Sequence, residues 1–145
     1  MDLCLGFRDA RGLGIKDKIR WYAGMVVQFA EDDELRNELQ ARLHETLASV
    51  KPDVIFAHSL GTLVVYDLLR QEAVNGISRN LTVVTSGSQI GHPALLMLFG
   101  GAIQPLNVNY WINLHNQNDK VFAYEPIGIE AENFSEIETP FSVDF

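Results

Sequence analysis

Apolar and polar positions follow two patterns along this chain, and together they predict an α/β fold. Three short apolar runs, rich in β-branched and aromatic residues, predict about three strands at residues 53–57, 81–86 and 109–115. Longer segments between and before them have the spacing of helices. Strands that alternate with helices favour a single parallel sheet with right-handed crossovers.

Helix boundaries are predicted from capping residues and from the apolar period. Asp32 or Asp33 can cap a helix that ends near Val50, in which leucine recurs every fourth residue from position 35 to position 47. Glu38 and Arg42 are expected to pair on its wet side. The other predicted helices span residues 18–30, 62–70 and about 93–99. The segment 125–145 has no helical period, so we predict a loop-like acidic tail.

Composition limits the classes of protein that fit. The 145 residues are 47% hydrophobic and 21% charged, as expected for one soluble domain spanning residues 1–145. A net charge of −8 argues against nucleic acid and anionic membranes as partners. No apolar stretch is long enough to span a bilayer, and the first residues lack the pattern of a signal peptide. We therefore expect a cytoplasmic protein, with its acidic tail simply solvated.

One stretch of the sequence suggests chemistry. The apolar run before Ala57 passes through Ser59 directly into a helix, so the serine is expected in an unfavourable turn conformation with small residues, Ala57 and Gly61, on either side. Its hydroxyl would project from the top of the sheet, and the Leu60 N–H would face a developing oxyanion. The alternative is a serine in an ordinary turn that caps the helix.

This pattern is G-x-S-x-G with alanine in place of the first glycine, and here the chain resembles the α/β-hydrolase family. The match is to a bacterial subgroup similar to serine esterases and lipases. In that subgroup a Gly-Ser-Pro-Leu-Gly-like loop follows the next strand, and residues 87–91 resemble it but depart at Gln89 and, conservatively, at Ile90. The run from Trp111 through Asn113 to Asp119 resembles the acid-bearing strand and loop. With a similar helix around Asp32, the resemblance covers about residues 25–124.

The resemblance implies a role for each matching residue. Ser59 would be the nucleophile, the Leu60 N–H an oxyanion donor, and Asp119 the acid that orients a histidine. Asp119 could instead be a turn-forming residue in its polar loop. The expected lining of the site comprises His58, Ser88, Gln89, His92 and His115.

The base is the difficulty, because no histidine follows Asp119, where the family order places one. His58 is expected to pack beside the elbow, His115 to form part of a wall, and His92 is the candidate for a substitute base. His44 is expected at the surface. The family's early strands are not recognisable either, so the first strand would become an unprotected apolar edge.

We therefore expect the central part of a partial α/β-hydrolase fold that lacks its N-terminal strands and its base. The expected partners are a small-molecule acyl substrate and the missing remainder of the domain. The predicted function is a serine hydrolase acting on a small acyl substrate, inactive as this fragment and without cofactor or metal. Esterase, thioesterase and acyltransferase stay open. The alternative is a non-catalytic α/β binding module or a decayed hydrolase.

Overall fold

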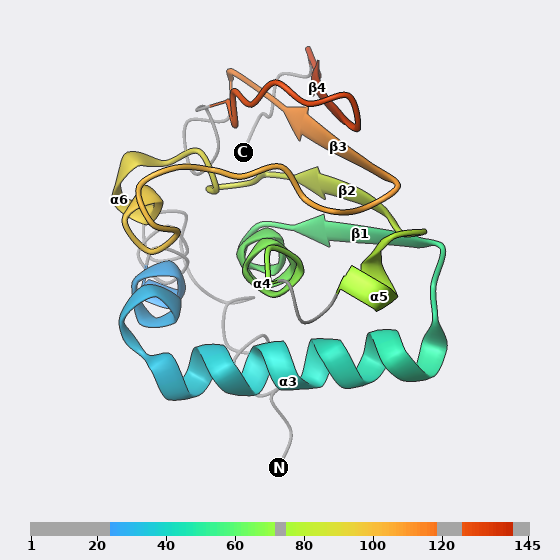
Figure 1. The fold of residues 1–145 in the computed structure, drawn as a ribbon. Helices are drawn as coiled ribbons and strands as arrows, with labels where there is room; N and C mark the ends of the chain where they lie inside the picture. Colours follow the sequence, from blue (N-terminus) through green and yellow to red (C-terminus); the bar gives the residue numbers. More distant parts are fainter. Residues whose placement is uncertain (1–23, 72–74, 119–125, 141–145) are drawn as a thin grey trace, which may run out of the picture.

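The computed structural model describes residues 24–71, 75–118 and 126–140, and these form an α/β fold around one parallel sheet (Figure 1). Neighbouring strands follow in chain order, and every pair is parallel. All three predicted strands are confirmed, and a fourth is added. The strands are β1 (Val54–His58), β2 (Thr82–Ser86), β3 (Tyr110–His115) and β4 (Phe134–Glu138).

The fourth strand corrects the prediction of a loop-like acidic tail over residues 125–145. Within it, Glu136 is half-buried and not simply solvated. Its carboxylate accepts hydrogen bonds from Asn113 Nδ2 and Ile127 N, both at 2.8 Å, and from Gly128 N at 3.3 Å. Because these donors satisfy the charge, an acidic residue fits inside a strand. A polar strand of this kind gives no apolar run, which is why the sequence pattern missed it.

Helices cover one side of the sheet. The long helix α3 (Asp33–Val50) packs on α4 (Leu60–Leu69), which lies between α3 and the strands (Figure 1). The Asp32 side chain caps α3 by accepting from Leu35 N at 2.9 Å, as one of the two predicted caps. Two short helices are α5 (Asn75–Ser78) and α6 (Pro93–Leu96). Residues 24–31 are helical, and the rest of the helix predicted at 18–30 lies outside the described residues.

The exposed side of α3 also agrees with the sequence pattern. Arg42 and Glu38 form an ion pair at 2.7 Å, and His44 is exposed. Of the leucines spaced along the helix, Leu47 is fully buried while the three before it are half-buried.

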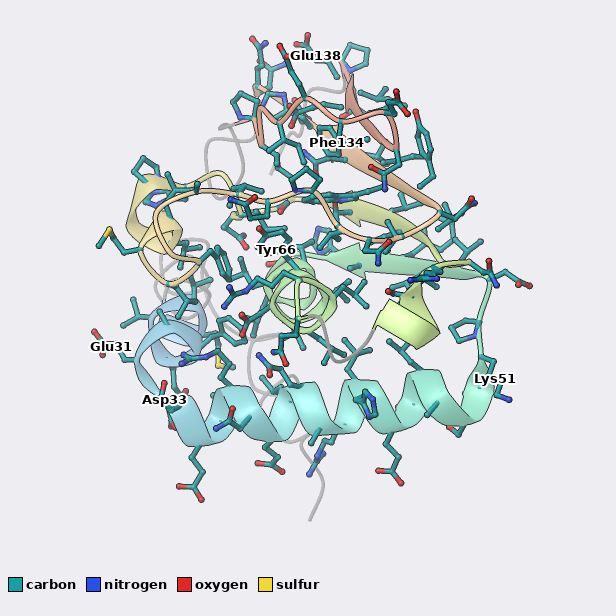
Figure 2. All side chains as sticks on the ribbon, viewed as in Figure 1. Glu31, Asp33, Lys51, Tyr66, Phe134 and Glu138 are labelled. Carbon is teal, nitrogen blue, oxygen red and sulfur yellow. The ribbon has the colours of Figure 1, made fainter. Side chains whose placement is uncertain are left out.

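Tyr66 of α4 anchors the helix layer to the sheet, at the centre of Figure 2. Its ring lies 4.8 Å from the Phe99 ring and 5.7 Å from the Trp111 ring of β3, centroid to centroid. The hydroxyl accepts a hydrogen bond from Gln104 N at 2.8 Å. Burial raises the pKa of the Tyr66 phenol above its ordinary value. The tyrosine thus fixes α4 against β3 from the centre of the core.

A buried ion network, which the sequence pattern did not reveal, joins α4 to α3. Asp67 is only 2% exposed and accepts a hydrogen bond from Arg70 Nε at 2.8 Å. From α3, Gln40 donates to the same carboxylate and Arg36 Nε lies 3.7 Å from it. In the sequence, this network is indicated by an aspartate in an otherwise apolar helix, three residues before an arginine. The network fixes the position of α4. Because α4 begins directly after Ser59, the network also helps to position the predicted turn.

Strand β1 is at the edge of the described sheet, as expected, and the described helices cover only one of its faces (Figure 1). Ala57 is buried on the side of the helices, whereas Phe56 is 81% and Val54 44% exposed on the other. No described strand pairs with the outer edge of β1. The expected apolar edge is therefore present in the described part of the chain.

Candidate active site

The turn between β1 and α4 is the most unusual backbone feature in the described residues. Ser59 has φ 52° and ψ −127°, a combination that L-residues with a Cβ rarely adopt. Its N–H donates to Ser86 O of β2 at 3.1 Å, and its carbonyl accepts from Thr62 N at 2.9 Å and from Thr62 Oγ1 at 2.7 Å. The predicted unfavourable turn conformation is confirmed, and hydrogen bonds on both sides of the residue hold it in place.

The hydroxyl of Ser59 has no role in capping the helix that follows. It makes no side-chain hydrogen bond to the first turn of α4, so the interpretation as an ordinary helix cap is wrong. The residue is half-buried and not sealed in the core. Backbone hydrogen bonds therefore hold the serine in place, and its hydroxyl does not stabilise the described fold.

The start of α4 can stabilise a negative charge beside this hydroxyl. Leu60 is the first residue of a ten-residue helix, where N–H groups have no intrahelical acceptor and the helix dipole is positive. An oxyanion formed on Ser59 would meet this end of the helix. Steric crowding does not explain the small residue expected at Gly61, because a Cβ at this position would meet no atom within 4 Å.

The loop after β2 lies directly against the turn. Gly87 has φ +55°, and a Cβ on it would come within 3.0 Å of His58 Nε2. A larger residue at this position would therefore be strained by the positive φ and would push against the His58 imidazole. His58 packs beside the elbow as predicted, with its imidazole on the exposed side of β1.

Farther along this loop, Ser88 and Gln89 are both buried. Ser88 Oγ accepts from Ile90 N at 3.3 Å, which stabilises the turn of the loop. The Gln89 carboxamide has no hydrogen-bond partner within the described part of the chain, for either its oxygen or its nitrogen. His92 is exposed, and its backbone N–H donates to the backbone carbonyl of Gln89 at 2.9 Å.

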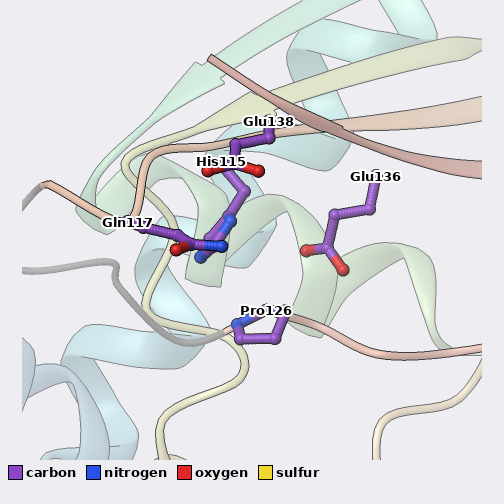
Figure 3. Close-up of a pocket in the computed structure, with 5 residues that line it drawn as sticks. All are labelled: His115, Gln117, Pro126, Glu136 and Glu138. Atoms are coloured by element: carbon purple, nitrogen blue, oxygen red, sulfur yellow. The ribbon is translucent and has the colours of Figure 1, made fainter. Parts of the chain in front are cut away.

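A cavity of about 510 Å³ lies farther along the same edge of the sheet (Figure 3). His115, at the end of β3, is buried, and its imidazole faces the same space as the Glu136 carboxylate. Ser59 follows β1, two strands away, so about 10 Å of sheet separates it from β3. His115 is therefore a wall residue of this cavity. The lining consists of His115, Gln117, Pro126, Glu136 and Glu138.

The structure brings some of the predicted site residues together and leaves others undecided. Ser59, Leu60, His58 and the loop with Ser88 and Gln89 are neighbours at the carboxyl ends of β1 and β2. Asp119 lies outside the described residues, so its predicted role as the acid stays a prediction.

In the ranges that the structure describes, no group of three or more His, Cys, Asp or Glu side chains could hold a metal ion. No helix in those ranges has the length and hydropathy needed to cross a bilayer. Comparison of the chain with protein-family models, with curated proteins and with solved structures gives no match.

Proposed function

We propose that this chain contains the nucleophile elbow of a serine hydrolase of the α/β-hydrolase type, acting on a small acyl substrate. The observation that supports the proposal best is the conformation of Ser59, φ 52° and ψ −127°, between a parallel strand and a helix. Backbone strain of this kind is concentrated at functional sites, because only a constrained surrounding structure maintains it.

In the proposed reaction, Ser59 Oγ attacks the acyl carbon and its proton passes to a base. The carbonyl oxygen becomes an oxyanion next to the Leu60 N–H and the positive end of α4. Asp119 follows β3 in the chain and would orient the base. When this oxyanion collapses, the bond to the leaving group breaks and that group takes the proton from the base, which leaves the acyl chain on Ser59. A water or another acceptor then attacks the same carbon, the acyl–Ser59 bond breaks, and the serine regains its proton.

The order of the elements supports the same family. The proposed nucleophile follows β1, the proposed acid follows β3, and β4 comes next. In the family that order continues with the histidine. Residues 139–145, after β4, contain no histidine. We therefore assign the base to none of His44, His58 and His115, and His92, on the loop after β2, is the candidate substitute.

A fluorophosphonate probe tests the proposal, because it reacts with activated serines. The protein expressed from its complete reading frame is expected to be labelled at Ser59, with mass spectrometry locating the adduct. Ser59→Ala should abolish labelling, whereas Ser49→Ala, at an exposed position of α3, should retain it. An unlabelled protein, in a sample where a control hydrolase reacts, would contradict the proposal.

The second candidate is a non-catalytic binding module or a decayed hydrolase. One observation favours it: nothing in the described residues hydrogen-bonds to Ser59 as a base would. A serine without a base keeps its proton and is a poor nucleophile. For residues 1–145 alone we expect little or no ester turnover, and a rate that disappears in Ser59→Ala would contradict that expectation.

A further inference from the structure

Thr62, in the first turn of α4, is a fully buried threonine whose hydroxyl contacts the backbone of Ser59. Its exposed fraction is 0%, and its Oγ1 donates to the Ser59 carbonyl at 2.7 Å. The Thr62 N–H donates to the same carbonyl at 2.9 Å. Valine has nearly the same shape and would fill this position without a polar atom that needs a partner. The hydroxyl therefore adds a second bond to a carbonyl that already has one.

The peptide unit that contains this carbonyl also contains the proposed oxyanion donor. In a trans peptide, the C=O of one residue and the N–H of the next lie in one plane and point in opposite directions. The Ser59 carbonyl points into α4 toward Thr62, so the Leu60 N–H points out of the helix, toward the side on which an oxyanion would form. Hydrogen bonds polarise one another, so a carbonyl that accepts two bonds makes the N–H of its peptide unit a stronger donor.

We propose that Thr62 is a positioning residue for the oxyanion site. Its hydroxyl fixes and polarises the Ser59–Leu60 peptide, and it acts on the oxyanion only through the Leu60 N–H. This inference rests on the proposed function of Ser59. The hydroxyl itself touches no substrate, because its proton is donated to the Ser59 carbonyl and the residue is buried. Its effect belongs to the transition state, in which the negative charge develops.

The rate constant of fluorophosphonate labelling tests the proposal, because the phosphonyl oxygen of the probe takes the place of the oxyanion. In protein expressed from the complete reading frame, Thr62→Val should lower the maximal rate constant at Ser59 about three- to tenfold, the effect of one neutral hydrogen bond. The probe concentration that gives half of this rate should change little. Thr62→Ser keeps the hydroxyl and should restore most of the rate.

Thr85 of β2 provides the matched control, as a second buried threonine with a hydrogen-bonded hydroxyl. It is 1% exposed, donates to Asn113 Oδ1 at 2.8 Å and accepts from Trp111 Nε1 at 3.0 Å. Thr85→Val should lower the free energy of unfolding at least as much as Thr62→Val, but leave the rate constant of labelling unchanged. Loss of folded protein alone would lower the final extent of labelling and not its rate constant.

Three results would each overturn the proposal: Thr62→Val labels as fast as the parent, Thr62→Ser labels as slowly as Thr62→Val, or Thr85→Val slows labelling equally. Thr62→Ala also lacks the hydroxyl and is expected to label as slowly, so it replaces Thr62→Val if that variant folds poorly. A parent that is not labelled would refute the proposed function and this inference together. A labelled parent with an unaffected Thr62→Val would refute only this inference.

Discussion

Two junctions flank β1, and each contains a non-glycine residue with positive φ, yet only one of them suggests chemistry. Lys51, between α3 and β1, has φ 49° and ψ 58°, which is the left-handed conformation in which helices commonly end. Ser59, between β1 and α4, has a similar φ of 52° but a ψ of −127°. Positive φ alone therefore does not mark a functional residue in this chain.

The surroundings of the two residues explain the difference. The N–H of Lys51 donates to Leu47 O at 3.0 Å, so its conformation terminates α3, and its side chain is exposed. Ser59 is held by Ser86 O on one side and by Thr62 on the other, while its own side chain makes no cap. The conformation of Lys51 ends a helix, whereas the conformation of Ser59 is maintained by hydrogen bonds from β2 and from the first turn of α4.

The largest predicted effect concerns the ion network that fixes α4 behind Ser59. Asp67→Ala should lower the free energy of unfolding by about 1.5–3 kcal/mol, because it removes the buried carboxylate that accepts hydrogen bonds from Gln40 and Arg70. Urea denaturation measures the loss. The matched control is Glu38→Ala, which breaks an exposed pair with Arg42 and should change stability by less than about 0.5 kcal/mol. Equal losses in the two variants would show that the network does not hold α4.

A smaller effect is predicted at the first junction. Lys51→Gly should raise the free energy of unfolding by about 0.5–1 kcal/mol, since glycine adopts the left-handed conformation without steric cost. Thermal or urea unfolding measures the gain. Labelling of Ser59 by the fluorophosphonate should not change. A loss of stability, or a change in labelling, would mean that the two junctions are not independent.

Much of the fold was predictable because short apolar runs are specific for buried parallel strands. β3 was predicted from such a run to within one residue, and Asp32 was one of two predicted caps of α3. β4 was not predictable, because its acidic Glu136 is satisfied by donors from distant segments that no local pattern reveals. The exposure of Phe56 was not predictable either, since an apolar run does not show whether helices cover one or both faces of the strand.

The candidate site likewise has one part that the sequence predicts and another that it does not. The turn at Ser59 follows from local sequence, because a strand that passes straight into a helix leaves few conformations for the residue between them. The unpaired carboxamide of Gln89 and the network of Asp67 depend on tertiary packing. They become visible only when the loop after β2 and the two helices are placed in space.

The central claim is that the fold holds Ser59 in a strained backbone conformation, and a comparison of two substitutions tests it most directly. Glycine relieves the strain at φ 52°, ψ −127°, whereas alanine retains it. We predict that Ser59→Gly is more stable than Ser59→Ala by about 1–2 kcal/mol in urea denaturation. At Ala41, exposed within α3, glycine should instead be less stable than alanine by about 1 kcal/mol. If Ser59→Gly proves less stable than Ser59→Ala, as at Ala41, the strained elbow does not exist.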